Sequence, residues 1–154
     1  MFVSTSHTIN TIGMHLLVQF AQGRFNSDSY ATEADLNTAL LQSPITELQQ
    51  QIYDWFYTAK TNVDALIFGY VAKFSLSMDD IEQSLLPGLA ADLMRYELCT
   101  NDADEGILKR RDNAIKQLEK IEKGVIQLKV STPKFSSRAI KTAKPASQFN
   151  WSGY

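Results

Sequence analysis

The sequence predicts a mainly α protein, a compact bundle of about four to five helices followed by an extended C-terminal segment and an arm. Apolar residues recur at spacings of three and four over most of residues 9–123. Capping residues, prolines and glycines separate these periodic stretches. The last residues lose the helical period and become basic. We therefore expect a helical domain over residues 1–131, with a short strand at about 125–131, and a basic, flexible arm over residues 132–154.

Two short helices are expected near the N-terminus. The apolar spacing predicts the first over residues 9–22, with Asn10 or Thr11 as its N-cap. The second is expected over residues 32–41. Its first residue is a threonine, and Asp35 follows three residues later, which resembles a capping box with aspartate in place of the usual glutamate.

The longest and most regular pattern begins at Ser43-Pro44, where proline suits the first position of a helix. Its apolar residues continue for about seven turns. They are Ile45, Leu48, Ile52, Trp55, Phe56, Ala59, Val63, Leu66, Ile67 and Tyr70. Residues 53–57 hold four aromatic side chains, and one helix cannot turn all four to a single core. Tyr53 and Tyr57 are therefore interface candidates that meet a second layer or another chain.

Three further signals divide the rest of the helical region. Ser77 is followed by two aspartates and predicts a capped helix start. Pro87-Gly88 interrupts or restarts that helix. The polar loop 100–102 is expected to cap a last helix over about residues 103–123, which Gly124 ends.

After Gly124, apolar and polar residues alternate, which predicts a strand. A lone strand needs a partner within the chain or from a neighbouring subunit. The arm that follows contains aromatic residues, which argues against an inert tail and favours an arm that orders on a partner. The interface candidates in this part of the chain are Ile126, Leu128, Val130, Phe135, Arg138, Phe149 and Trp151.

The charge is unevenly distributed. Residues 1–124 hold all 17 acidic residues and ten basic ones, a net charge of −7, whereas residues 125–154 hold five basic residues and no acid. An acidic body with a basic arm suits self-association or docking onto an acidic partner. The alternative is a solvated tail whose charge only aids solubility. No apolar stretch approaches the roughly 18 residues of a membrane span, so we expect no membrane partner.

The residues that could carry chemistry form no recognisable motif. His7 and His15 have no nearby metal-ligand pattern, and Cys99 reads as a packed side chain. The acids at 79–82 suit the first turn of a helix, and Lys109-Arg110-Arg111 is interleaved with acids. We expect no enzymatic activity, no cofactor and no metal, and at most non-specific contact between the arm and nucleic acid.

Three segments resemble a family of small Mu-like phage proteins, whose members are head–tail connector or head-completion subunits. They are Asp64 to Tyr70, Leu85 to Leu98 and Leu118 to Leu128, and the resemblance covers about residues 33–130. Residues 71–76 depart from it, because the family has a basic residue with tyrosine and a proline pair there, and residues 1–31 match poorly.

The resemblance implies a structural protein that forms a ring of identical subunits at the portal vertex and joins capsid to tail. Its partners would be further copies of itself, the portal and tail-completion proteins. It would reside in the host cytoplasm during assembly and then in the virion neck. In such a ring, each subunit can lend its arm to the next, a heterologous contact that closes by rotation. The alternative is a small nucleic-acid-binding module that uses the basic arm.

Overall fold

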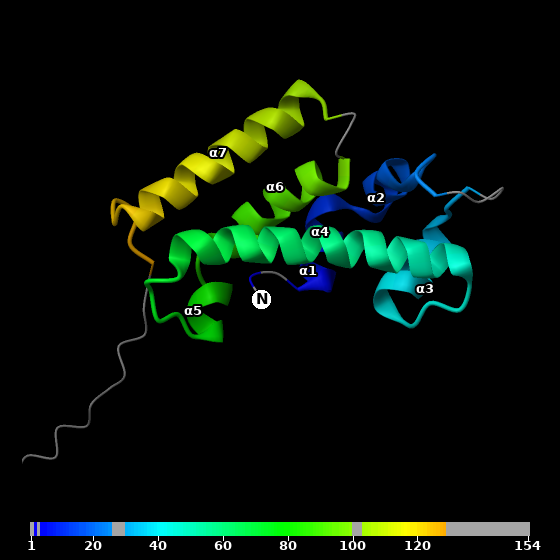
Figure 1. The fold of residues 1–154 in the computed structure, drawn as a ribbon, viewed down its shortest axis with the longest axis horizontal. Helices are drawn as coiled ribbons and strands as arrows, with labels where there is room; N and C mark the ends of the chain where they lie inside the picture. Colours follow the sequence, from blue (N-terminus) through cyan, green and yellow to red (C-terminus); the bar gives the residue numbers. More distant parts are fainter. Residues whose placement is uncertain (1, 3, 26–29, 100–102, 129–154) are drawn as a thin grey trace, which may run out of the picture.

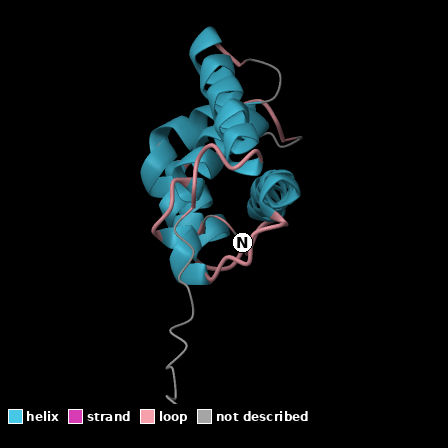
Figure 2. Cartoon of the chain, turned by 90° about the vertical axis from the view of Figure 1, so that its left-hand side faces the viewer, coloured by secondary structure: helices cyan, strands magenta, loops and turns pink. Residues whose placement is uncertain are grey.

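The computed structural model describes residue 2 and residues 4–25, 30–99 and 103–128. These residues form seven helices and no strand (Figures 1 and 2), which confirms the mainly α class. The helices are α1 Thr5–Ile12, α2 Met14–Ala21, α3 Glu33–Leu41, α4 Glu47–Val71, α5 Met78–Glu82, α6 Leu86–Cys99 and α7 Glu105–Glu122. The helices outnumber those expected because two short ones, α1 and α5, are separate elements.

Gly13 divides the N-terminal region into α1 and α2, so the single helix expected over residues 9–22 is wrong. Its φ of +92° lies in the region that favours glycine, and its N–H donates to the carbonyl of Ile9 at 2.8 Å. The N-cap is also earlier than expected. The hydroxyl of Ser4, rather than Asn10 or Thr11, accepts a hydrogen bond from the backbone N–H of His7 at 3.1 Å.

Two of the expected helix starts are confirmed, at Thr32 and at Ser77, and both are complete capping boxes. The start expected at Ser43-Pro44 is wrong, because α4 begins after Thr46. Thr46 and Gln49 form a capping box of their own, and the Gln49 side chain also accepts from the N–H of Ile45 at 2.9 Å. Ile45 therefore precedes the helix and is 84% exposed.

The long helix α4 and the helix α6 organise the packing. α4 contacts α3, α6 and α7, while α6 also contacts α1, α2 and α5. Figure 1 shows α4 crossing the molecule, and Figure 2 shows it nearly end-on. The buried face of α4 carries residues that are at most 1% exposed, Ile52, Phe56, Val63 and Ile67. Its C-terminal end is joined to that of α7 by a hydrogen bond from Lys73 Nζ to the carbonyl of Glu122.

The last helix, α7, is capped by Asp104, whose Oδ1 accepts from the N–H of Ile107 at 2.7 Å. The cap expected at residues 100–102 lies outside the described residues. Gly124 ends the helix as expected, with a φ of +75°.

The strand expected at about 125–131 is not present over residues 125–128. The backbone N–H groups of Val125 and Ile126 both donate to the carbonyl of Lys120, at 2.8 and 3.2 Å. These bonds satisfy a carbonyl group in the last turn of α7. Residues 125 and 126 therefore form the turn that ends the helix and do not pair as a strand. Leu128 then turns into the core and is 8% exposed. Residues 129–131 of the expected strand lie outside the described residues.

Candidate interface surfaces

The two candidate tyrosines of α4 lie together on one side of the helix. The rings of Tyr53 and Tyr57 are 4.2 Å apart between centroids, and both side chains are half-buried. The hydroxyls of Tyr57 and Thr5 share a hydrogen bond at 3.3 Å. Tyr57 therefore meets a second layer of the same chain, the start of α1, while part of each ring stays open to solvent.

The other two aromatic residues of this cluster point elsewhere. Phe56 is fully buried in the core. Trp55 meets Phe25 edge to face at 5.9 Å between ring centroids, and the guanidinium of Arg24 lies 5.7 Å from its ring. Arg24 also donates to the carbonyl of Cys99 at 2.8 Å. Its side chain therefore connects Trp55 of α4 with the C-terminal ends of α2 and α6. The four aromatic side chains thus point in several directions around one helix.

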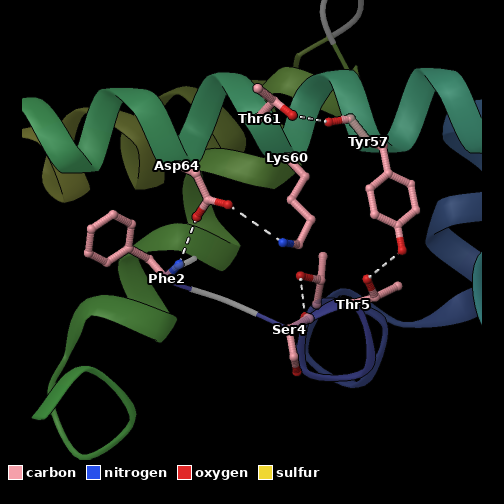
Figure 3. A network of polar contacts seen from close by, with 8 residues as sticks. Phe2, Ser4, Thr5, Tyr57, Lys60, Thr61 and Asp64 are labelled. Atoms are coloured by element: carbon pink, nitrogen blue, oxygen red, sulfur yellow. Dashed lines mark hydrogen bonds and ion pairs between the residues drawn. The ribbon is translucent and has the colours of Figure 1, made fainter. Parts of the chain in front are cut away.

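An ion pair on α4 between a buried lysine and a partly exposed aspartate holds the beginning of the chain (Figure 3). Lys60 is 1% exposed, and its Nζ lies 3.5 Å from Oδ2 of Asp64. The other carboxylate oxygen, Oδ1, accepts from the backbone N–H of Phe2 at 2.7 Å. Sequence reasoning missed this pair, although the spacing of four residues between a lysine and an aspartate on one helix was the available signal.

A pocket of about 370 Å³ opens beside this N-terminal segment. Its apolar walls are Phe2, Met78, Ile81 and Pro87, which come from the chain start, α5 and the first turn of α6. Glu82 and His7 supply polar atoms. The Met78 side chain is 57% exposed, which is unusual for a large apolar residue and marks the mouth of the pocket as a surface that can receive another group.

The basic cluster of α7 is paired with carboxylates. The partners are Glu105 for Lys109 at 2.8 Å, Asp92 for Arg110 at 3.6 Å and Asp112 for Arg111 at 3.4 Å. Arg111 also lies 4.4 Å from the centre of the Tyr96 ring. This basic cluster is therefore charge-balanced, as its interleaved sequence indicated, whereas residues 129–154 hold five basic residues and no acid.

The described residues offer no assembled site for metal chemistry. Within them, no three His, Cys, Asp or Glu side chains are grouped to hold a metal ion. His15 shares a hydrogen bond with Gln19 at 3.1 Å, and His7 lines the pocket. Over the same part of the chain, no helix is both long and apolar enough to cross a membrane.

The remaining interface candidates fall into two groups. Ile126 is half-buried and Leu128 is buried, so the structure turns both inward. The other candidates lie outside the described residues, and their interface role stays a prediction. They are Val130, Phe135, Arg138, Phe149 and Trp151.

Residues 30–144 match the sequence model of the family described as Bacteriophage Mu, Gp36. The match begins just before α3 and continues past Leu128 to Lys144. It therefore includes all five basic residues of residues 129–154, the whole segment after Leu128, which is called the arm from here on. Neither the curated proteins nor the solved structures contain a match to the chain. Because the matched range covers well over half of its length, this chain is a phage protein that belongs to the Bacteriophage Mu Gp36 family.

Proposed function

We propose that this protein is a head–tail connector or head-completion subunit, which oligomerises at the portal vertex and joins the capsid to the tail. The observation that carries the proposal is the match to the Mu Gp36 family over residues 30–144. The connector role itself comes from the resemblance of three helical segments to small Mu-like connector proteins. In this proposal the protein is structural and has no enzymatic activity.

The arm supports self-association. It has five basic residues and no acid, whereas residues 1–124 have a net charge of −7, and all five basic residues fall inside the range matched by the family. Opposite charges on the two parts of one chain favour contact between copies, because the arm of one subunit is attracted to the body of the next. A ring follows if each subunit passes its arm in the same direction.

The proposed partners are further copies of the chain, the portal and the tail-completion proteins. The proposed location is the host cytoplasm during assembly and then the neck of the virion. A small helical domain with a long arm suits a position between two larger rings, because the domain can pack side by side with its copies while the arm reaches across a joint.

The experiment that tests the function is disruption of the coding sequence in a prophage that carries it, followed by electron microscopy of the induced lysate. We expect DNA-filled heads and complete tails that are not joined, and rescue by the intact gene supplied separately. Normal joined particles, or a lysate without any heads, would overturn the proposal, since a connector acts after both parts exist.

A nucleic-acid-binding module remains the second candidate, and the basic arm is the observation that favours it. Five positive charges on the arm would give weak, salt-sensitive binding to phosphates without sequence preference. A gel-retardation series with duplex DNA separates the two candidates. Retardation at physiological salt would favour this second candidate, whereas a band that moves freely there favours the connector.

A further inference from the structure

We infer that the apolar pocket between the chain start, α5 and α6 is the receptor for the C-terminal arm of a neighbouring copy, with Trp151 as the anchoring side chain. The inference rests on the proposed function, because it names the contact by which the subunits of the oligomer are joined. It goes further by assigning one surface and one segment to that contact.

The pocket has the chemistry of an anchor site for an aromatic side chain. Its volume of about 370 Å³ lies at the small end of the range of ligand pockets, roughly 300–1,000 Å³. Phe2, Ile81 and Pro87 give it apolar walls, and the flexible Met78 side chain stands at its mouth. Tryptophan and tyrosine in such pockets are typical hot spots of protein interfaces. The arm supplies Trp151, together with Phe149.

The charges around the pocket complement those of the arm. Residues 74–91 contain three acids and no lysine or arginine. Two of them, Asp79 and Glu82, are exposed, and the third, Asp80, caps α5 from a buried position. The arm carries five basic residues and no acid. An anchored aromatic residue near the end of the arm would bring its preceding lysines to this acidic rim.

The arm leaves the body at the end of the molecule where the pocket lies. Lys73, between α4 and α5, donates to the carbonyl of Glu122 at the end of α7, and the described chain ends six residues later at Leu128. Figure 1 shows the described segment after α7, drawn in orange, ending near the C-terminal end of α4. Leu128 is buried, so the arm has a fixed point of departure.

The arm is long enough to reach a neighbour. Its 26 residues span up to roughly 85 Å when extended. The long helix α4, with 25 residues, measures about 37 Å. An arm that starts near the C-terminal end of α4 and can span more than twice the length of α4 can therefore reach the pocket of the next subunit.

Disulfide trapping between two differently substituted full-length chains tests the contact. Both carry Cys99→Ser, which removes the single native thiol; one adds Met78→Cys at the pocket mouth and the other Ser152→Cys on the arm, next to Trp151, which is kept. A matched control replaces Met78→Cys by Leu108→Cys, which is also an exposed apolar position but lies on α7. On mild oxidation of the mixture, we expect disulfide-linked pairs of the two chains to form roughly tenfold faster with Met78→Cys than with Leu108→Cys, because bound segments reach high effective concentrations.

Two results would overturn the inference. The first is equal rates of linkage for the pocket and control positions. The second comes from a chain that carries Met78→Cys and Ser152→Cys together. If that chain forms only a bond within itself, the pocket holds its own arm. Cys99→Ser is common to all the variants, and the added cysteines lie at exposed or arm positions, so circular dichroism should show the same helix content for all of them.

A charge reversal provides the second measurement. Glu82→Lys at the rim should slow linkage between Met78→Cys and Ser152→Cys, whereas Asp112→Lys, an exposed acid on α7, should leave it unchanged. Equal effects of the two reversals would overturn the assigned site. The trapping is independent of the phage experiment. Linked chains with normally joined particles would refute the connector alone, and unjoined heads without linked chains would refute the pocket alone.

Discussion

Asp35 joins the starts of two helices through one carboxylate. Its Oδ2 accepts from the hydroxyl and the backbone N–H of Thr32, at 2.6 and 3.1 Å, and completes the cap of α3. Its Oδ1 accepts from the side-chain amide of Gln49 at 3.1 Å, the residue that completes the cap of α4. The hydrogen bond from the Thr32 side chain is the main reason that the pKa of Asp35 lies below its usual value. Those from Gln49 and the Thr32 backbone add to the effect and outweigh burial, which raises the pKa.

Asp35→Asn should lower stability at neutral pH and have less effect in acid. The pKa of Asp35 is lower in the folded than in the unfolded state, so its contribution is present above the unfolded value of about 3.9 and is lost as pH falls through the folded pKa. At neutral pH the loss should be about 1 kcal/mol, as for other caps. Urea unfolding of both proteins at neutral pH and at about pH 3 measures it. The prediction fails if the difference between the two proteins is the same at both pH values.

The ion pair of Lys60 and Asp64 gives a second test at the level of single residues. Asp64→Ala removes both the partner of a buried ammonium and the acceptor of the Phe2 N–H, and should cost roughly 2–4 kcal/mol. Adding Lys60→Met should restore part of this loss, because the uncompensated charge is then gone. A double-mutant cycle by urea unfolding measures the coupling. Losses that simply add would contradict a coupled pair.

At the level of helices, short-range signals in the sequence predicted those boundaries that local chemistry decides. Thr32, Ser77 and Gly124 were identified because a cap or a left-handed glycine acts within a few residues. The start of α4 was misplaced because two cap signals compete there, and the Thr46 box, which Asp35 reinforces from α3, prevails over Ser43-Pro44. The period of the apolar residues found α4 but could not show where Gly13 would break the N-terminal helix.

Gly13→Ala tests that break. An alanine with φ near +92° is strained, so the substitution should destabilise the fold by about 1 kcal/mol or more even though the space around the position is open. Gly69→Ala is the matched control, because Gly69 lies within α4 and is also in open space. This variant should be more stable than the unchanged protein by up to about 1 kcal/mol. Thermal unfolding of both variants measures the effects. Stabilisation by Gly13→Ala would mean that residues 9–22 prefer the continuous helix that their spacing predicts.

At the level of the whole molecule, the sequence revealed the arm and the charge asymmetry but not the pocket. The arm is visible because composition changes after Gly124 and all the acids precede it. The pocket is hidden because Phe2 and Pro87 are far apart in sequence and line one pocket only in the folded chain. Leu128 was expected on a strand at an interface; it is buried, since the backbone of residues 125 and 126 closes the end of α7.

The most direct test of self-association through the arm is the solution mass of the full chain and of a chain that ends at Leu128, measured by light scattering over a concentration series. The truncation keeps every described residue of the helical domain. We expect a discrete oligomer for the full chain and a monomer for the shortened one. The helical circular dichroism signal per mole of chain should be the same for both. Equal masses for the two chains, whether both are oligomers or both remain near the size of one chain, would contradict assembly through the arm.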